Sequence, residues 1–122
     1  MSLDPRNPKE SVIELQILHG LNLIYSRVGF FWKNPTTGYF NVKTKMFSKH
    51  SNPYCLNGVP DIVGIIEGRW IGLEVKSKTG VLSLSQKIFH EKARKYKGHV
   101  SVVTSLKDAE NAVKEVLASI KV

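Results

Sequence analysis

Residues 58–76 read Gly-Val-Pro-Asp-Ile-Val-Gly-Ile-Ile-Glu-Gly-Arg-Trp-Ile-Gly-Leu-Glu-Val-Lys, and this stretch decides how we expect the chain to fold. The apolar run at 61–66 is typical of a buried strand, and residues 70–76 predict a second strand. The Glu-Gly pair at 67–68 indicates a tight turn between them. The two strands should therefore pair as an antiparallel hairpin.

Two carboxylates and a lysine converge on this hairpin. Glu74 and Lys76 lie two residues apart on a strand, so they share a face, and the register places Asp61 close to Glu74. Neighbouring carboxylates raise each other's pKa, and a divalent cation removes that conflict. Mg²⁺ held here would polarise a phosphoryl group. We expect Lys76 to position or deprotonate the attacking water and to offset charge in the transition state.

Upstream of the hairpin, the sequence predicts a long helix. Asn7 should cap it with Glu10 in its first turn, and it should run to about Arg27 with Gly29 as its stop. Extended back by one turn, its inward stripe reaches Glu14, a carboxylate that is costly to bury unless something binds it. The stripe itself consists of Ile17, Leu18, Leu21, Ile24, Tyr25 and Val28.

The segment between this helix and the hairpin predicts less regular structure. Residues 30–32 indicate a short strand, and 33–58 contain many turn formers. Such a long irregular stretch usually has a function or hides a hairpin. Within it, residues 40–47 alternate enough to be a strand.

Downstream of the hairpin, Ser83 and Gln86 form a capping box that opens a helix to about Tyr96. Residues 100–104 predict another strand, and Ser105 should cap a last helix. The inward stripe of that helix should be Leu106, Ala109, Val113, Val116, Leu117 and Ile120. The element order predicts an α/β fold, a mixed sheet flanked by helices, in one domain over 1–122.

The amino-acid composition limits the kinds of function that the chain could have. Lys and Arg number 18 against 10 Asp and Glu, and a net charge of +8 is typical of a nucleic-acid binder. The apolar runs are far shorter than a membrane span, so we expect no membrane partner. A single cysteine excludes an internal disulfide and a cysteine-based zinc cluster, which suits a reducing cytoplasm.

The motif series resembles a known nuclease family. Gly58-Val59-Pro60-Asp61 followed by Glu74-Val75-Lys76 resembles the PD-(D/E)XK motif. The stretches 68–76, 80–86 and 98–105 extend the likeness to the VRR-NUC family, in particular its small stand-alone phage and bacterial members. The Val-Arg-Arg pattern behind the family's name reads Val-Val-Thr at 102–104, so the resemblance rests on the other motifs.

The resemblance implies a restriction-endonuclease-like fold with an α-β-β-β-α-β core and Mg²⁺- or Mn²⁺-dependent hydrolysis of phosphodiester bonds in DNA. Carried over, Asp61 and Glu74 are metal ligands with the Val75 carbonyl, and Lys76 is the catalytic lysine. Gln86 matches the glutamine after the Glu-Val-Lys strand. Glu14 matches an acidic residue of the first helix that helps to hold metal through water. These assignments make Asp61, Glu74, Lys76, Gln86 and Glu14 the predicted catalytic residues.

Other interpretations of the same residues stay open. Gln86 fits a capping box without any catalytic role. Lys43 and Lys45, which alternate with aromatic residues, suit DNA contact, as do Lys78 and Lys87, but all four also fit a solvated surface. The rival functions are a Holliday-junction resolvase, which would act on branched DNA, and a non-catalytic nucleic-acid-binding domain. We expect the chain to form a homodimer, because junction-cutting enzymes act as two-fold dimers.

Overall fold

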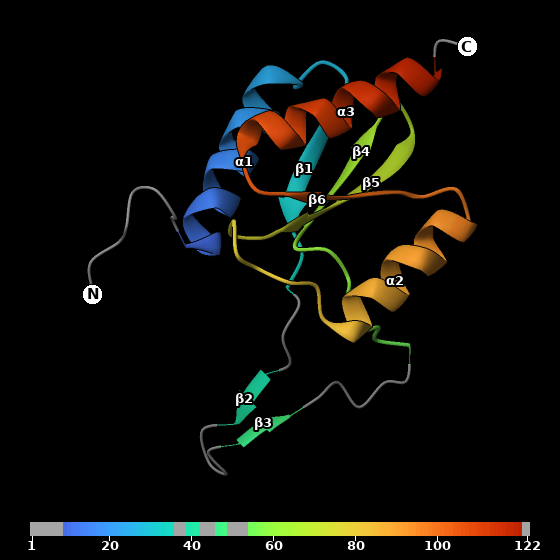
Figure 1. Cartoon of the computed structure of the whole chain (residues 1–122). Helices are drawn as coiled ribbons and strands as arrows, with labels where there is room; N and C mark the ends of the chain where they lie inside the picture. The colour runs from blue at the N-terminus through green and yellow to red at the C-terminus, as the bar shows by residue number, and fades with distance from the viewer. Residues whose placement is uncertain (1–8, 36–38, 42–45, 49–53, 121–122) are drawn as a thin grey trace.

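The structure is a computed structural model of the chain, and it describes residues 9–35, 39–41, 46–48 and 54–120. Three helices and a four-stranded mixed sheet form the body of the molecule (Figure 1). The elements are α1 (Glu10–Ile24), β1 (Gly29–Lys33), β2 (Tyr39–Asn41), β3 (Met46–Ser48), β4 (Ile62–Ile66), β5 (Arg69–Val75), α2 (Leu84–Lys95), β6 (His99–Val103) and α3 (Leu106–Ile120). This architecture confirms the predicted α/β class with a mixed sheet.

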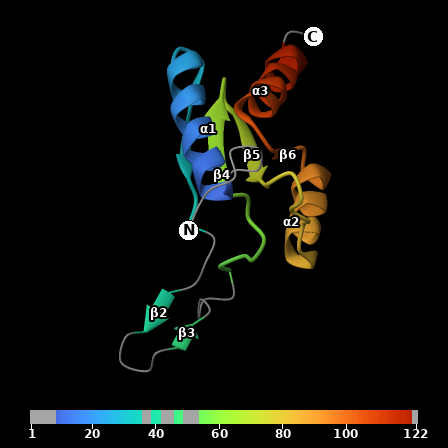
Figure 2. The same ribbon diagram turned by 60° about the vertical axis from the view of Figure 1, so that its left-hand side comes forward.

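The sheet has the strand order β1-β4-β5-β6. β1 pairs antiparallel with β4, β4 pairs antiparallel with β5, and β5 pairs parallel with β6 across the α2 connection. β2 and β3 form a separate two-stranded hairpin that projects away from this sheet (Figure 2). The predicted order of elements is therefore confirmed, with one further strand in the connection between β1 and β4.

The β4–β5 hairpin is closed by a two-residue turn whose conformation explains its sharpness. Glu67 and Gly68 both have positive φ, 48° and 78°, as a type I′ turn requires. This turn matches the right-handed twist of the flanking strands and fixes the register, in which Ile62 faces Leu73 and Ile66 faces Arg69. The hairpin predicted from residues 58–76 is confirmed.

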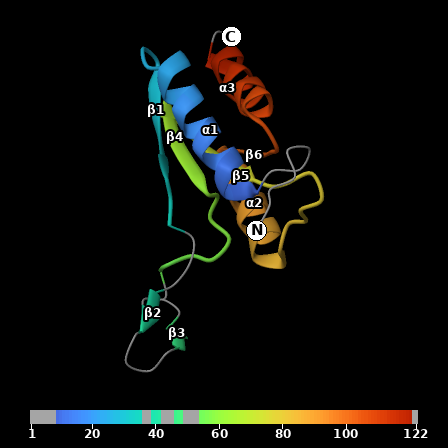
Figure 3. The same ribbon diagram turned by 90° about the vertical axis from the view of Figure 1, so that its left-hand side faces the viewer.

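The two faces of the sheet are covered differently. α1 and α3 lie together over one face (Figure 3), where the alternate β5 residues Ile71, Leu73 and Val75 are fully buried. α2 contacts the other face, where the Phe89 ring lies 6.3 Å from that of Trp70. The apolar core therefore lies between the sheet and α1 with α3, and its helix residues include Ile13, Ile17, Leu21, Ala109, Ala112, Val113 and Val116.

The first helix differs from its prediction at both ends. It begins at Glu10 with Lys9 as its cap, so Glu10 is its first residue, and the predicted cap Asn7 lies outside the described residues. It ends at Ile24 rather than Arg27, which leaves Ile24 half exposed instead of inward. Gly29 is not a helix stop but the first residue of β1. A side chain there would collide with the Ile65 carbonyl, so glycine is needed for β1 to approach β4.

The predicted strand over residues 40–47 is wrong. Its two ends lie on different strands, β2 and β3, and Phe40 pairs with Phe47 across the hairpin. An alternation of apolar and polar residues over so short a stretch is equally consistent with one strand and with two short antiparallel strands. The sequence therefore did not reveal the hairpin. The other predicted elements downstream, α2, β6 and α3, agree with the structure to within one residue at each end.

No helix in the described part of the chain is both long enough and apolar enough to cross a membrane.

Candidate active site

The β4–β5 register brings Asp61 and Glu74 together. Ile62 pairs with Leu73, so one further step along the ladder places Asp61 opposite Glu74. Residues directly opposite in an antiparallel pair project from the same face. This is the face that α2 contacts, because Glu74 alternates with the core residues Leu73 and Val75. The convergence predicted from the sequence is therefore present.

Glu74 is buried in a way that is unusual for a carboxylate. Its side chain is 1% exposed, and its Oε1 atom has no hydrogen-bond partner among the described residues. Nε2 of His90 lies 3.6 Å away, and in the described part of the chain this buried atom has no hydrogen-bond partner either. Two buried polar atoms without partners cost stability, and such pairs in a native protein call for an explanation.

The electrostatics of Glu74 follow from this burial. Burial, which has the largest effect, together with a hydrogen bond with Asp61 and the negative charge of Asp61, raises the pKa of its carboxyl group to about 9. The Lys76 ammonium acts in the opposite direction, and the Glu10 carboxylate adds to the rise. Without a cation, Glu74 therefore keeps its proton at neutral pH.

Asp61 is held by the backbone of the opposite strand. The Val75 N–H donates to Oδ2 of Asp61 at 3.0 Å, and the Asn34 N–H donates to the Asp61 carbonyl at 2.8 Å. On its other side, β5 pairs with β6, where the Lys76 N–H donates to the Val103 carbonyl at 3.0 Å. Because strand residues alternate in direction, the N–H and C=O of Val75 both face the Asp61 side. The predicted ligand oxygen of Val75 thus lies beside Asp61.

The first helix contributes a carboxylate that the sequence analysis did not assign to the site. Glu10 accepts a hydrogen bond from the Ser77 N–H at 3.4 Å and raises the pKa of Glu74. The predicted residue Glu14 instead pairs with Lys33, with Oε1 and Nζ 2.6 Å apart and the Glu14 side chain 14% exposed. The water-mediated metal role of Glu14 stays a prediction.

The second helix presents two polar residues toward this region. Gln86 forms the predicted capping box: its Oε1 accepts from the Ser83 N–H at 2.8 Å, and its own N–H donates to Ser83 Oγ at 3.2 Å. The catalytic role of Gln86 stays a prediction beside this structural one. One turn further, His90 reaches Glu74. Burial, with the charges of Arg94 and Lys76, lowers the pKa of His90, which is therefore neutral at pH 7.

The basic residues fall into three groups. Lys76 is partly buried at the end of β5, beside the carboxylates. Lys78 and Lys87 are exposed, in the loop after β5 and in the first turn of α2. Lys43 and Lys45 lie outside the described residues. The contacts of these four exposed or undescribed lysines with DNA stay predictions.

Sequence reasoning missed Glu10 and His90, although each had a signal. Glu10 lies one turn before Glu14, so one more step along the inward stripe would have reached it. His90 lies one turn after Gln86 on the same side of α2. Its contact with Glu74 depends on how α2 crosses the sheet, which no local pattern gives.

The donor set suits Mg²⁺ or Mn²⁺ better than a metal that needs many side chains. Among the described residues, no three His, Cys, Asp or Glu side chains stand together as a ready metal site. Mg²⁺ in proteins usually takes one or two carboxylates and completes its shell with water and phosphate oxygens. The unpartnered Glu74 Oε1, the Asp61 carboxylate and the Val75 carbonyl fit that pattern.

No protein-family model, no curated protein and no solved structure matches this chain.

Proposed function

We propose that this protein is a metal-dependent nuclease that hydrolyses phosphodiester bonds in DNA. The observation that carries the proposal is the Glu74 side chain, which is 1% exposed and has an oxygen without a partner, next to Asp61 and Lys76. Replacing a buried charged pair with apolar residues of similar volume is often neutral or stabilising. A strand that served only the fold would gain nothing from these two carboxylates.

Asp61, Glu74 and the Val75 carbonyl would hold the cation, and Glu10 would orient its water shell. When bound, Mg²⁺ or Mn²⁺ supplies Lewis-acid stabilisation of the charge on the phosphoryl group. A bound cation would displace the Glu74 proton to solvent. His90 Nε2, 3.6 Å from Oε1, would then donate to the carboxylate and fix its orientation, as partners behind metal ligands commonly do.

Lys76 is the residue of this chain that faces the developing charge. Its ammonium is compact, has three rotatable donors and lies on the same face as Glu74. A cation at this position binds a non-bridging phosphate oxygen and orients the attacking water. It stabilises the transition state more than the ground state, because negative charge grows there.

The element order supports a restriction-endonuclease-like fold for this proposal. A helix, three antiparallel strands, a crossover helix and a parallel strand correspond to α1, β1-β4-β5, α2 and β6. The net charge of +8 supports a polyanionic substrate. We further propose that the chain is a member of the VRR-NUC family.

Cleavage assays test the proposal directly. Linear duplex, single-stranded, flapped and four-way DNA are incubated with the protein in Mg²⁺, in Mn²⁺ and in EDTA, with Glu74→Gln as the matched control. We expect the metals to switch on cleavage of at least one substrate and EDTA or Glu74→Gln to abolish it. Full activity in EDTA contradicts the proposed chemistry. Tight DNA binding without cleavage in any metal would make the protein a non-catalytic binding domain.

A further inference from the structure

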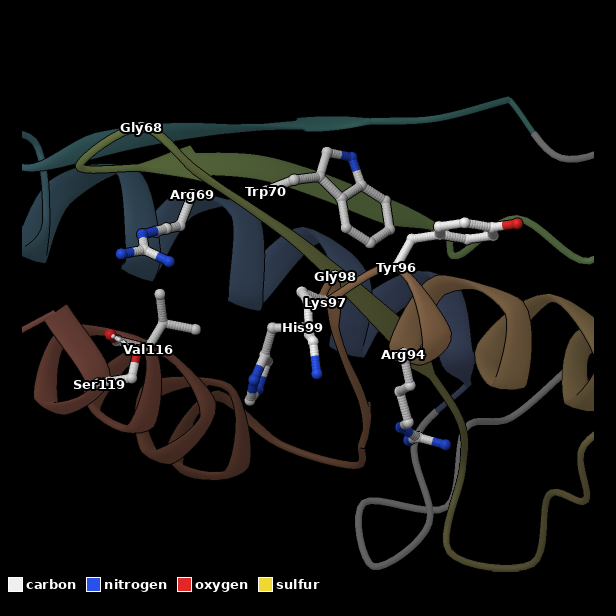
Figure 4. Close-up of a pocket in the computed structure, with 10 residues that line it drawn as sticks. All are labelled: Gly68, Arg69, Trp70, Arg94, Tyr96, Lys97, Gly98, His99, Val116 and Ser119. Atoms are coloured by element: carbon white, nitrogen blue, oxygen red, sulfur yellow. Dashed lines mark hydrogen bonds between the residues drawn. The ribbon is translucent and has the colours of Figure 1, made fainter.

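A second cavity lies at the opposite end of β5 from the candidate active site. It has a volume of about 470 Å³ and is bounded by the β4–β5 turn, the end of α2 and the last turns of α3 (Figure 4). Arg69 and Glu74 stand about 17 Å apart along β5 at roughly 3.3 Å per residue. The cavity is therefore distinct from the carboxylate cluster but lies on the same strand.

The lining of this cavity is basic and contains no carboxylate. Arg69, Arg94, Lys97 and His99 line it, together with the aromatic residues Trp70 and Tyr96. Trp70 lies on the same face of β5 as Glu74, because the two residues are an even number of positions apart. A cavity with cations and aromatic rings but no acidic group suits a ligand that joins a phosphate to a planar ring.

Among the described residues, two of the basic side chains that line the cavity have no partner and can bind a ligand. Arg94 is partly used, because its Nη2 donates to the Val100 carbonyl at 3.0 Å. His99 Nε2 lies 3.1 Å from Ser101 Oγ and 3.8 Å from an oxygen of Glu115, which is outside the lining. Arg69 and Lys97 have no side-chain ion pair or hydrogen bond with another described residue.

Lys97 occupies a position that glycine usually fills. The Gly98 N–H donates to the Ala93 carbonyl at 2.8 Å and the Lys97 N–H donates to the Arg94 carbonyl at 3.0 Å, which is the Schellman arrangement at the end of α2. The residue at the left-handed position of that motif is normally glycine, but here it is Lys97, with φ of 70°. A lysine at this position costs some backbone free energy, and its side chain lines the cavity.

We propose that this cavity binds a nucleotide phosphate, with Arg69 and Lys97 as the phosphate contacts and Trp70 and Tyr96 beside the base or sugar. The inference rests on the proposed function in one respect: it takes the ligand to be part of, or derived from, a DNA substrate. At 3.4 Å per nucleotide of B-DNA, the distance of about 17 Å corresponds to roughly five nucleotides from the cleaved bond. The cavity would therefore contact the DNA several nucleotides away from the bond that is cleaved.

Tryptophan fluorescence reports on the cavity directly. The chain has two tryptophans, so Trp32→Phe leaves Trp70 as the only one. The protein is titrated in EDTA, where the proposed cleavage is off, with either deoxyadenosine monophosphate or a short single-stranded oligodeoxynucleotide. A saturable change in Trp70 emission with the mononucleotide identifies a free nucleotide as sufficient. A change with the oligonucleotide alone identifies a phosphate within a strand. Either result supports the proposal.

The variants Lys97→Gly and Arg69→Gln test the two proposed phosphate contacts. Lys107→Gln, at the end of α3 that lies away from the cavity, is the control that removes one positive charge elsewhere. We expect each cavity variant to weaken oligonucleotide binding about fivefold at roughly 0.1 M salt and to lower the salt slope by about 0.7. Lys97→Gly has a second use. Glycine removes the backbone strain, so its thermal midpoint should stay the same or rise while binding falls. Lost binding therefore cannot be ascribed to unfolding.

The proposal is overturned if neither ligand changes Trp70 emission. It is also overturned if the cavity variants weaken binding no more than Lys107→Gln does. Both readouts are made without metal, so they do not depend on catalysis. If the protein binds through the cavity but never cleaves DNA, the nuclease proposal fails alone. If cleavage requires Glu74 but the cavity variants bind normally, only the cavity proposal fails.

Discussion

At the scale of single residues, Asp61 and Glu74 are close enough to change each other's ionisation. Glu74 holds its proton chiefly because it is buried and also because Asp61 lies opposite it, while Lys76 offsets only part of the rise in its pKa. In the metal-free protein, the proximity of these two carboxyl groups is therefore electrostatically unfavourable. A cation that replaces the Glu74 proton relieves that cost, so protons and metal should compete for one position.

The first prediction concerns Asp61→Asn. Asparagine keeps an oxygen that can accept from the Val75 N–H, so the fold should be retained and the metal-free stability should be unchanged or higher. The stabilisation given by Mg²⁺ should disappear, because one ligand charge is lost. Cleavage should fall by roughly a hundredfold or more. Thermal melts with and without Mg²⁺ beside a nuclease assay measure all three. An unfolded Asp61→Asn protein would make Asp61 a structural residue.

Lys76→Ala should separate catalysis from metal binding. Lysine is not a ligand for Mg²⁺, so calorimetry should still detect metal binding while cleavage falls about as far as in Asp61→Asn. Lys114→Ala is the matched control, because Lys114 is an exposed lysine of α3 with no predicted DNA contact. Equal activity of the Lys76 and Lys114 variants would remove Lys76 from the site.

The third prediction follows from the raised pKa of Glu74. Its folded pKa is about 9 and its ordinary value is 4.5, so between these values the folded protein holds a proton that the unfolded chain releases. The stability from this group is complete below about pH 4.5 and is lost as the pH rises toward about 9. His90 and His99, whose pKa values are lowered, are neutral in both states above pH 7.

Chemical denaturation of the metal-free protein between pH 7 and about 9 measures this slope. We expect stability to fall across that window in the wild type and to fall less in Glu74→Gln. Glu91→Gln, which changes an exposed carboxylate, is the control and should show the same slope as the wild type. Added Mg²⁺ should stabilise more strongly at the higher pH, because fewer protons compete. A slope that is identical in all three proteins would show that Glu74 does not titrate there.

At the scale of elements, the β4–β5 hairpin sets the geometry of the site through its turn. Both turn residues have positive φ, which glycine adopts freely and glutamate does not. The fourth prediction is that Glu67→Asn stabilises the protein by about 1 kcal/mol, because Asn-Gly is the preferred type I′ pair. Glu67→Ala keeps the strain and should give no such gain. Urea denaturation of both variants decides the point.

The same hairpin shows how far sequence reasoning reached. The periodicity of its strands, its turn and its carboxylates all lie within a short stretch of sequence. Both the fold of residues 61–76 and the meeting of Asp61 with Glu74 were therefore predictable. The residue at which α1 ends was not predictable, because it depends on contacts with residues that are distant in the sequence. Asn22 bonds to both the N–H and the carbonyl of Phe31, and Gly29 must approach β4. His90 at the site likewise depends on where α2 crosses the sheet.

At the scale of the whole molecule, the net charge of +8 is carried by a chain that also buries a carboxylate. The basic groups include exposed residues along α2, among them Lys87, Lys92 and Lys95, and the lining of the second cavity. A surface of this kind attracts the phosphate backbone without reading its sequence.

The fifth prediction is that DNA affinity falls steeply as salt rises, because each neutralised phosphate releases counterions. Fluorescence anisotropy of labelled duplex DNA in EDTA, over a series of salt concentrations, gives the slope of log affinity against log salt. We expect a slope that corresponds to several phosphate contacts. A flat dependence would mean that the basic surface is not where DNA binds.

The short connection between β4 and β5 also bears on the order of events during folding. This pairing closes only a two-residue turn, whereas β1–β4 pairing encloses residues 34–61 and β5–β6 pairing needs the α2 crossover. Short loops close at the lowest entropic cost, and hairpins form in about 1–10 μs. We therefore expect Asp61 and Glu74 to meet while both are still in water. We expect the carboxylate pair to be enclosed later, when α2 packs against the sheet and brings His90 to Glu74.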